Sequence, residues 1–381
     1  MPLHGYYWSK HLRLIPALEG EVDLRVLGQW KGGNPVNATI QDVAASAHVS
    51  VSTVSRAFNN PSLVSDKTRA RVLEAARQLN FSIMRSATVL KSGQSLRIAL
   101  LISSPIQSWF NSSILEGLNT IFNPAGYDIA IRRILTLQER QEFFRDLPIR
   151  RNADAVIVTS FDIDKDEVER LHSADVPLIG INSSLSELFD AAVNIDDVQG
   201  GMLLARHLMS LGHRNIAFII TEMYASVLHF SAQKRVNAFL DTCRANGVEP
   251  TIIKVADSHD QIDDALTQIF SLSSLPTAIA CQEDGIAVPL MFELQKSGIE
   301  VPATVSVTGF DDSLYAHEVG LTTIHQDPIQ LGKIAARKAL DLIAGKKITN
   351  TCETVPAKLI LRSSTSRPRH EAESITSGQQ P

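Results

Sequence analysis

The chain has 381 residues, a formal net charge of −5 and 20% charged residues, which describes a globular protein too long for one ordinary domain. Its three cysteines are odd in number and far apart in the sequence, which argues against a disulfide framework or a zinc site. It lacks an apolar run of transmembrane length and a signal peptide, so we expect a cytoplasmic protein without a membrane partner.

Residues 1–37 follow neither a helical nor a strand pattern. They contain aromatic residues and leucines without a sustained period, and they end in the turn-forming sequence GGNPVN. We interpret them as a disordered extension or as the product of a start codon assigned too early. An arm that contacts DNA is the alternative.

Residues 38–81 are predicted to form a helix-turn-helix domain with a third, supporting helix. Ile40, Val43, Ala44 and Ala47 have the spacing of one buried helical face, and Thr39 is placed to cap that helix. A turn is expected at residues 48–50. The second helix buries Val51, Val54 and Phe58, and the third, capped by Ser65, carries Val72, Leu73, Ala76 and Leu79.

The charge of this segment favours DNA binding. Two short helices joined by a tight turn let the second helix enter a major groove, but other small helical bundles show the same periodicity. Residues 38–97 carry eight cationic and three acidic side chains, a net charge of +5, which leaves −10 for the rest of the chain. A basic module on an acidic body indicates an electrostatic footprint for phosphate.

Two runs in this segment identify a family. The run DVAASAHVSVSTVSR, followed by VSDKTRARVLEAARQLNF, strongly resembles the headpiece of the lactose/galactose repressor (LacI/GalR) family of bacterial transcription regulators. The resemblance implies a homodimer that binds a palindromic operator in double-stranded DNA. The residues that it places at the DNA are Thr39, Ser50, Val51, Ser52, Thr53, Ser55, Arg56, Asn59 and Leu90.

The expected contacts with DNA are of two kinds. Val51, Ser52 and Arg56 would face base edges, which carry sequence information. Thr53, Ser55, Asn59 and the basic residues of the third helix would position the phosphates.

Residues 82–95 take the place of the family's hinge helix. Leu90 matches the leucine that the family pushes into the minor groove, and an apolar wedge is what such kinking needs. Ile83-Met84 replaces the usual Pro-Asn and Thr88 replaces the usual arginine, so this hinge departs from the family there. A plain linker with an incidental leucine is the alternative.

From Arg97 onward, short apolar runs alternate with helical stretches. The runs RIALLIS, AVIVTS, VPLIGIN, NIAFIIT, TAIAC and VSVTGF are rich in Ile and Val, as buried parallel strands are. SSILEGLNTIF, GGMLLARHLMSLG, QKRVNAFLDTCRANG and GIAVPLMFELQKSG are the helical stretches between them. This alternation predicts an α/β body of two doubly wound parallel sheets.

The resemblance extends to Pro368 and implies a body similar to periplasmic sugar-binding proteins. Residues 96–362 would form an effector-binding and dimerisation core of two subdomains, joined by crossovers near Ile195, near Gln326 and between Asn350 and Val355. Residues 363–381 are read as a polar tail. Because that tail has no leucine heptad, we expect a dimer and not a tetramer.

A cleft between two such subdomains is the expected effector site, because ligands bind outside the carboxyl ends of parallel strands. Arg235 stands at the family's ligand-anchoring arginine, and Asp311, Asn182 and Gln326 match other polar site positions. Trp109 and Phe110 are suited to stacking on a sugar ring or a base. Taken singly, Asp311 could instead cap a helix, and Arg235 could form a surface ion pair.

Glu283 departs from the family, because it replaces an asparagine that usually precedes the aspartate of this motif. An added carboxylate favours a ligand with more hydrogen-bond donors, or a cationic one. It disfavours an acidic ligand unless Arg235 offsets Glu283.

The working hypothesis is therefore a ligand-responsive transcription regulator, most often a repressor in this family, controlled by a small sugar-like effector. We expect no catalytic residue, cofactor or metal, since no GxGxxG after a strand, Walker loop, HExxH or Gly-x-Ser-x-Gly motif is present. A solute-binding protein and a sugar-processing enzyme that uses the same cleft are the alternatives.

Overall fold

The structure is a computed structural model that describes residues 38–59, 63–79, 81, 94–150, 152–183, 185–222 and 232–369. The chain divides into two compact units, Met1–Thr88 and Val89–Pro381, each of which is described by itself. Residues 1–37, Leu90 and most of the predicted hinge lie outside the described residues, as does the side chain of Asn59.

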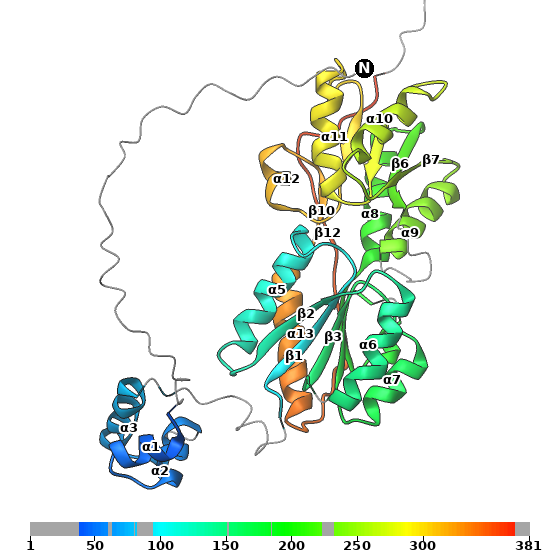
Figure 1. Cartoon of the computed structure of the whole chain (residues 1–381). Helices are drawn as coiled ribbons and strands as arrows, with labels where there is room; N and C mark the ends of the chain where they lie inside the picture. The colour runs from blue at the N-terminus through cyan, green and yellow to red at the C-terminus, as the bar shows by residue number, and fades with distance from the viewer. Residues whose placement is uncertain are drawn as a thin grey trace, which may run out of the picture. The chain divides into compact units, whose positions relative to one another are not determined.

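The first unit contains three helices packed around one small core (Figure 1). They are α1 (Ile40–Ser46), α2 (Val51–Asn59) and α3 (Asp66–Gln78). The core holds Val43, Ala44, Ala47, Val54, Ala57, Val72, Ala75 and Ala76. The predicted helix-turn-helix with a third supporting helix is therefore confirmed.

Side-chain caps set where these helices begin. Thr39 and Asp42 form a reciprocal capping box on α1, in which the Thr39 hydroxyl accepts from the Asp42 N–H and donates to the Asp42 carboxylate. The hydrogen bonds from Thr39 lower the pKa of Asp42. Ser65 accepts from the backbone N–H of Thr68 at the start of α3, as expected.

Two apolar residues of this unit lie differently from the prediction. Val51 is 41% exposed, because it is the first residue of α2 and the buried face of that helix is formed by Val54 and Ala57. Leu79 caps the end of α3 and is also exposed, while Ala75 fills the core position in its place.

The body contains a six-stranded parallel sheet in the order β11-β5-β4-β3-β1-β2. Its strands are β1 (Arg97–Ile102), β2 (Asp128–Arg133), β3 (Ala155–Thr159), β4 (Leu178–Ile181), β5 (Ala191–Ile195) and β11 (Cys352–Val355). Helices α5 (Trp109–Phe122) and α13 (Pro328–Ile343) pack on one face, and α6 (Leu137–Arg150) and α7 (Lys165–His172) pack on the other. We call this the N-terminal subdomain.

A four-stranded parallel sheet in the order β7-β6-β8-β9 forms the C-terminal subdomain. Its strands are β6 (Ile216–Glu222), β7 (Thr251–Ala256), β8 (Ala278–Cys281) and β9 (Ser306–Thr308). Helices α8 (Asp197–Leu211) and α9 (Ala232–Ala245) cover one face, and α10 (Gln261–Phe270) and α11 (Asp284–Lys296) cover the other. The short helix α12 (Leu314–Glu318) follows β9.

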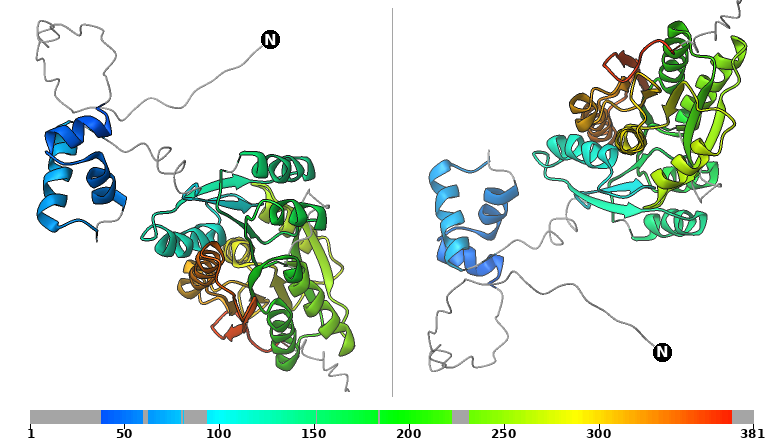
Figure 2. Two further views of the ribbon diagram at one scale, coloured as in Figure 1. Left: turned by 90° about the horizontal axis from the view of Figure 1, so that it is seen from below. Right: turned by 90° about the horizontal axis from the view of Figure 1, so that it is seen from above.

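Both subdomains therefore have a helix–sheet–helix arrangement, which the views from below and above also show (Figure 2). The predicted doubly wound α/β body is confirmed. No helix within the described ranges is long and apolar enough to cross a membrane.

Three crossovers connect the subdomains. The chain leaves the six-stranded sheet after Ile195, where β5 gives way to α8, and returns between β10 (Thr323–His325) and α13. The third crossover was expected before Val355, but β11 pairs in the N-terminal sheet up to that residue. The chain crosses after it, at Pro356-Ala357, and then forms β12 (Lys358–Ile360) antiparallel to β10.

The predicted polar tail begins later than residue 363. Ser364 is buried, and its hydroxyl donates to the carbonyl of Val307 at 2.6 Å. His213 is buried too, and its ring nitrogens contact the Thr277 hydroxyl at 2.9 Å and the Ser366 carbonyl at 2.9 Å. These hydrogen bonds tie the first residues of the expected tail to the C-terminal subdomain.

Substitution of Gly117 by alanine should destabilise the N-terminal subdomain, because an added Cβ would overlap the carbonyl oxygen of Ile329 where α5 meets α13. Overpacking against backbone costs about 1–3 kcal/mol, which thermal unfolding of the two proteins would show. Gly285→Ala in α11 is the matched control, because the nearest atom to its new Cβ lies 3.4 Å away. Equal melting temperatures for both variants would contradict this packing.

The part of the body's stability that depends on His207 and His213 should be lost as the pH is lowered through about 6.5, the ordinary pKa of histidine. Burial lowers the pKa of His213 in the folded state, and that of His207 likewise. The unfolded chain therefore takes up protons first, and the free energy of unfolding decreases. Denaturation of the wild type and of a His207→Gln, His213→Asn double variant across this pH range isolates this contribution, because the buried carboxylates titrate in both proteins. As the pH is lowered, the wild type should lose free energy of unfolding relative to the variant. Parallel profiles would contradict the assignment.

Candidate functional site

The first candidate surface is the outward face of α2. Val51, Ser52 and Arg56 are exposed there, and the structure shows no ion pair of Arg56 with another described residue. Thr53 and Ser55 are half-buried on the same helix. The Ser50 hydroxyl lies 2.8 Å from those of Ser52 and Thr53 and accepts from the Thr53 N–H, so it also caps the helix. A cation and small hydroxyls thus share one exposed helical face.

The second candidate site is built around Arg235 on α9. Its Nε donates to the carboxylate of Asp197 at 2.7 Å, and its Nη1 donates to the carbonyl of Gln282 at 3.3 Å. The guanidinium carbon lies 3.7 Å from the centroid of the Phe310 ring, within the range of a cation–π interaction. Arg235 is buried, so its ion pair is not the surface pair considered above.

Asp197, the first residue of α8, is the main charge partner of Arg235. Burial raises the pKa of Asp197, while the positive charges of Arg235 and Lys234 counteract that rise. The 2.7 Å hydrogen bond and the buried cation argue for an ionised pair. The sequence prediction did not include Asp197, although the adjacent aspartates Asp196 and Asp197 follow directly after β5.

Asp311 and Gln326 come together beside this arginine. The Gln326 side-chain amide donates to Asp311 Oδ1 at 2.5 Å, and Arg235 Nη1 lies 3.8 Å from the same oxygen. Burial, together with the nearby charge of Asp284, raises the pKa of Asp311 well above its usual range. Gln326 is buried, and none of the described residues hydrogen-bonds to its Oε1.

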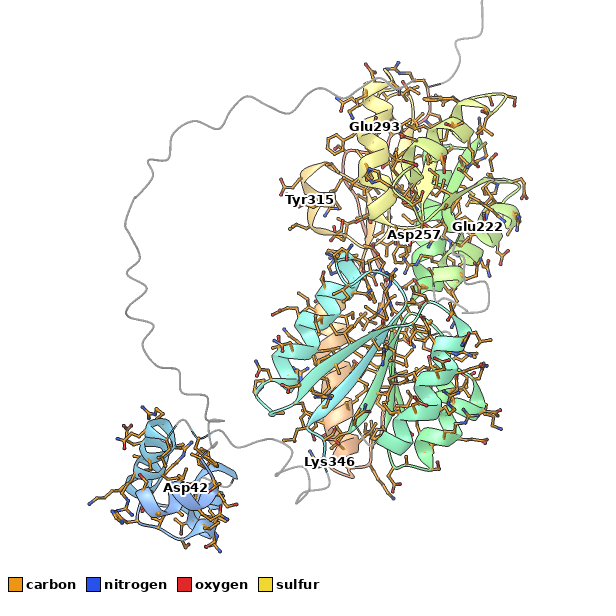
Figure 3. The ribbon with its side chains drawn as sticks, viewed as in Figure 1. Asp42, Glu222, Asp257, Glu293, Tyr315 and Lys346 are labelled. Atoms are coloured by element: carbon orange, nitrogen blue, oxygen red, sulfur yellow. The ribbon has the colours of Figure 1, made fainter. Side chains whose placement is uncertain are left out.

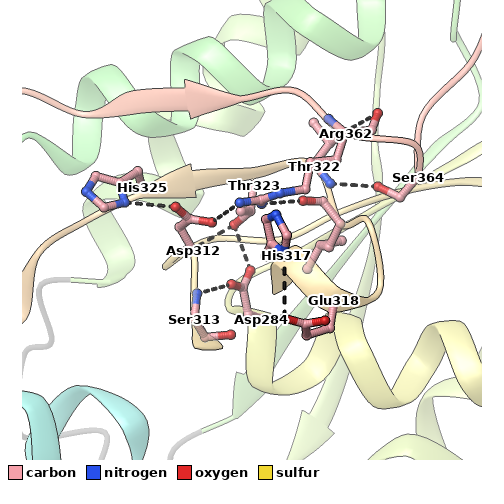
Figure 4. A network of polar contacts seen from close by, with 11 residues as sticks. Asp284, Asp312, Ser313, His317, Glu318, Thr322, Thr323, His325, Arg362 and Ser364 are labelled. Atoms are coloured by element: carbon pink, nitrogen blue, oxygen red, sulfur yellow. Dashed lines mark hydrogen bonds and ion pairs between the residues drawn. The ribbon is translucent and has the colours of Figure 1, made fainter. Parts of the chain in front are cut away.

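A polar network holds the loop that carries Asp311 (Figure 4). Asp311 and Asp312 have φ angles of 130° and 57°, in the region that L-residues rarely adopt. The Asp312 carboxylate accepts from Arg362 at 2.6 Å and contacts His325 Nδ1 at 2.9 Å. These bonds anchor the strained loop against β10, so the direction of Asp311 is fixed without a ligand.

Asp284 anchors the same loop from α11. Its carboxylate accepts from the Thr323 hydroxyl at 2.7 Å and from the Ser313 N–H at 2.8 Å. Burial raises the pKa of Asp284 to about 6. Asp311 does not cap a helix, because the N-cap residue of the next helix, α12, is Ser313.

Glu283 stands at the N-cap of α11 but makes no capping hydrogen bond. The Glu283 residue is exposed to solvent. The surrounding protein nevertheless partly desolvates its carboxylate, which raises the pKa of that group. The charge of Arg235 counteracts that rise, while the charges of Asp257 and Asp284 add to it. Asp257 follows β7, and Figure 3 places it at the end of the C-terminal subdomain that faces the N-terminal one.

The N-terminal subdomain supplies the other predicted residues. Trp109 and Phe110 begin α5, and Phe110 packs against the core of the sheet. Asn182 follows β4 and is buried, with its side-chain oxygen accepting from the Ile195 N–H at 2.9 Å. Asn182 also lines a hollow of about 230 Å³ at the crossovers, which Asp197, Lys234 and Cys352 share.

The structure thus brings Arg235, Asp311, Gln326 and Glu283 together on one wall, and it places Trp109, Phe110 and Asn182 on the other subdomain. No described set of three His, Cys, Asp or Glu side chains could hold a metal ion. A helix-turn-helix unit with a two-subdomain α/β body defines the class of DNA-binding regulators built on a periplasmic-binding-protein-like fold.

Comparison with known proteins gives the family. Residues 39–82 match the bacterial regulatory proteins of the lacI family, and residues 205–365 match the periplasmic binding protein-like domain. The HTH-type transcriptional repressor CytR of Escherichia coli (strain K12) is 30% identical over 335 residues, which cover 86% of this chain and 96% of that protein. The chain belongs to the lacI family. It is a DNA-binding transcription regulator and not an enzyme.

Two further relatives agree. The HTH-type transcriptional repressor PurR of Vibrio atlanticus (strain LGP32) is 28% identical over 314 residues, covering 81% of this chain and 93% of that protein. The crystal structure of the Lac repressor dimer bound to operator and the anti-inducer ONPF has a TM-score of 0.74 at 25% identity. It covers 87% of this chain and 99% of that chain.

Replacing Asp197 by alanine should strongly destabilise the body, because it leaves the buried Arg235 charge without its partner. Removing one member of a buried ion pair costs about 3–5 kcal/mol, measurable by denaturant unfolding. Glu249→Ala is the matched control, because it breaks an exposed arginine–carboxylate pair with Arg244. We expect no clear loss there. A stable Asp197→Ala protein would show that the pair does not hold Arg235.

Proposed function

We propose that this protein is a repressor that binds a palindromic operator as a homodimer in the cytoplasm and is controlled by a small polyhydroxylated effector. The main observation that supports this proposal is that one chain has two separate candidate surfaces. One is the exposed basic face of α2, and the other is the wall around Arg235, where directed polar side chains are held in place without a ligand.

Operator recognition rests on the exposed residues of α2. Arg56 has the length and the paired donors to contact a guanine edge, while Val51 and Ser52 reach bases over a shorter range. Lys67, Arg69 and Arg71 on α3 are exposed and would meet phosphates. The relatives described as transcriptional repressors, and the Lac repressor dimer bound to operator, support this role.

The dimer would use a surface over α11 and α12. Phe292 is 51% exposed, Leu314 71% and Tyr315 64%, an unusual grouping of large apolar side chains on adjacent helices. Figure 3 shows Tyr315 pointing away from the body. A second copy that covers this surface would bury these side chains and supply the two-fold axis that a palindrome requires.

Effector control would act through the crossovers. Asp197 lies directly after the first crossover and Gln326 lies at the second, so residues beside the effector also belong to the segments that join the subdomains. A ligand that contacts both walls would favour one angle between the subdomains. That angle would set how the two headpieces of a dimer meet the operator. Effector binding and operator binding would then be coupled through a two-state change of the body.

The Arg56→Ala variant should bind the protein's own promoter region more weakly and lose about 1–3 kcal/mol of discrimination between the correct and altered operators. Lys67→Ala is the matched comparison. It should weaken binding evenly across sequences. It should also reduce by about one the slope of log affinity against log salt concentration, as expected for the loss of a phosphate contact. Fluorescence anisotropy at several salt concentrations separates the two effects. An Arg56→Ala protein with unchanged affinity and preference would contradict the assignment of α2.

Sedimentation equilibrium should report a dimer, and Phe292→Glu should shift it towards monomer by placing a charge in the apolar interface. Leu185→Glu, at an exposed apolar position of the N-terminal subdomain, is the control and should leave the dimer unchanged. A stable tetramer, or a Phe292→Glu dimer of undiminished affinity, would count against the proposed interface.

A further inference from the structure

We propose that the effector carries an ammonium group, which Glu283 and Asp257 bind while its hydroxyls contact Asp311 and Gln326. The effector is then a cationic amine on a hydroxyl-rich small molecule. This inference rests on the proposed function and names the chemistry of the ligand at that same site.

Arg235 and Lys234, the cations of this wall, both act on the same carboxylate, Asp197. Arg235 has its Nε on Asp197, one Nη1 donor on the Gln282 carbonyl and its face on the Phe310 ring. Lys234 lines the hollow at the crossovers together with Asp197 and adds positive charge to the same carboxylate. Acidic side chains therefore outnumber these two cations on the wall, which disfavours an anionic ligand.

The acceptors, in contrast, are left over. The described residues supply no hydrogen bond or ion pair to the carboxylates of Glu283 and Asp257, and Glu283 does not even cap its own helix. The buried Gln326 Oε1 has no hydrogen-bond partner within the described ranges, and the nitrogen of the same amide is directed at Asp311. Buried polar atoms nearly always have a partner, so this oxygen points to a donor that the ligand brings.

The electrostatics lead to the same conclusion. The surrounding protein raises the pKa of Glu283 by desolvation, and the charges of Asp257 and Asp284 add to the rise; Glu283 in turn helps to raise the pKa of Asp311. The positive charge of Arg235 lowers both pKa values but does not cancel the rise, so these carboxylates are only partly compensated. A ligand carboxylate or phosphate would add to this repulsion, whereas an ammonium group would relieve it and form charge-assisted hydrogen bonds.

A metal ion is a poorer occupant of this wall than an organic cation. In the part of the chain that the structure describes, no three acidic, histidine or cysteine side chains are arranged to hold a metal. Glu283 and Asp257 extend from different strand ends, at the carboxyl ends of β8 and β7. Such a pair of spaced acceptors suits several N–H donors on one small molecule.

The test is a thermal-shift and calorimetry comparison of matched sugars with the full chain at neutral pH. Glucosamine, galactosamine and mannosamine carry the ammonium group. Their N-acetyl derivatives and parent hexoses keep the shape without the charge, and gluconate carries a negative charge instead. We expect at least one amino sugar to bind and to alter operator affinity. Its N-acetyl and parent forms should bind on the order of tenfold to a hundredfold more weakly.

Two variants assign the effect to the named residues. Glu283→Gln keeps the shape of the side chain, so it should weaken the amino sugar by a similar factor and leave a neutral sugar nearly unaffected. Arg235→Ala should remove binding of any cleft ligand. The melting temperature of each unliganded variant reports whether it is folded.

The outcomes separate this inference from the proposed function. A neutral sugar that binds as well as its amine, an amino sugar indifferent to Glu283→Gln, or a panel in which no amine binds would overturn the inference. Operator binding by the unliganded protein would still support the proposed function. If the unliganded wild-type protein does not bind its operator, the proposed function as a transcription regulator is wrong.

Discussion

The buried ion pair between Arg235 and Asp197 is the interaction on which the proposed effector site depends. It joins α9 to the start of α8, and the ring of Phe310 brings the end of β9 under the same guanidinium. The two helices approach closely because Gly201 of α8 lies against the carbonyl of Arg235, where a larger residue would not fit. The arginine is thus fixed before a ligand arrives, and binding does not have to order it.

Because the first two crossovers run beside this pair, the proposed effector site and the connections between the subdomains share residues. Asp197 follows β5 at the first crossover, and Gln326 follows β10 at the second. The strained loop at Asp311 is held on β10 by Asp312 and Arg362. In the proposed function, a ligand that contacts Asp311 and Gln326 would act directly on the second of the segments that connect the subdomains, which would give the proposed coupling a short physical route.

The sequence predicted the interior strands β1, β3, β4, β6 and β8 and the edge strand β9, but it missed the interior strand β5 and the edge strands β2, β7 and β11. Runs such as AVIVT in β3 are buried on both faces and therefore continuously apolar, whereas β2 and β7 lie at sheet edges, carry exposed or charged residues and were not predicted. Arg235, Asp311 and Gln326 were found because a family resemblance placed them. Asp197 was missed, since its role depends on a contact between α8 and α9 that no local pattern encodes.

The central claim is that ligand binding in the cleft and operator binding by α2 shift the same conformational equilibrium. Thermodynamic linkage between the two binding affinities tests this claim most directly. The measurement is the affinity for operator with and without a saturating cleft ligand, together with the affinity for that ligand with and without operator. The account predicts that both affinities change by the same factor, typically about 5- to 150-fold. A ligand whose binding depends on Arg235 but leaves operator affinity unchanged would contradict it.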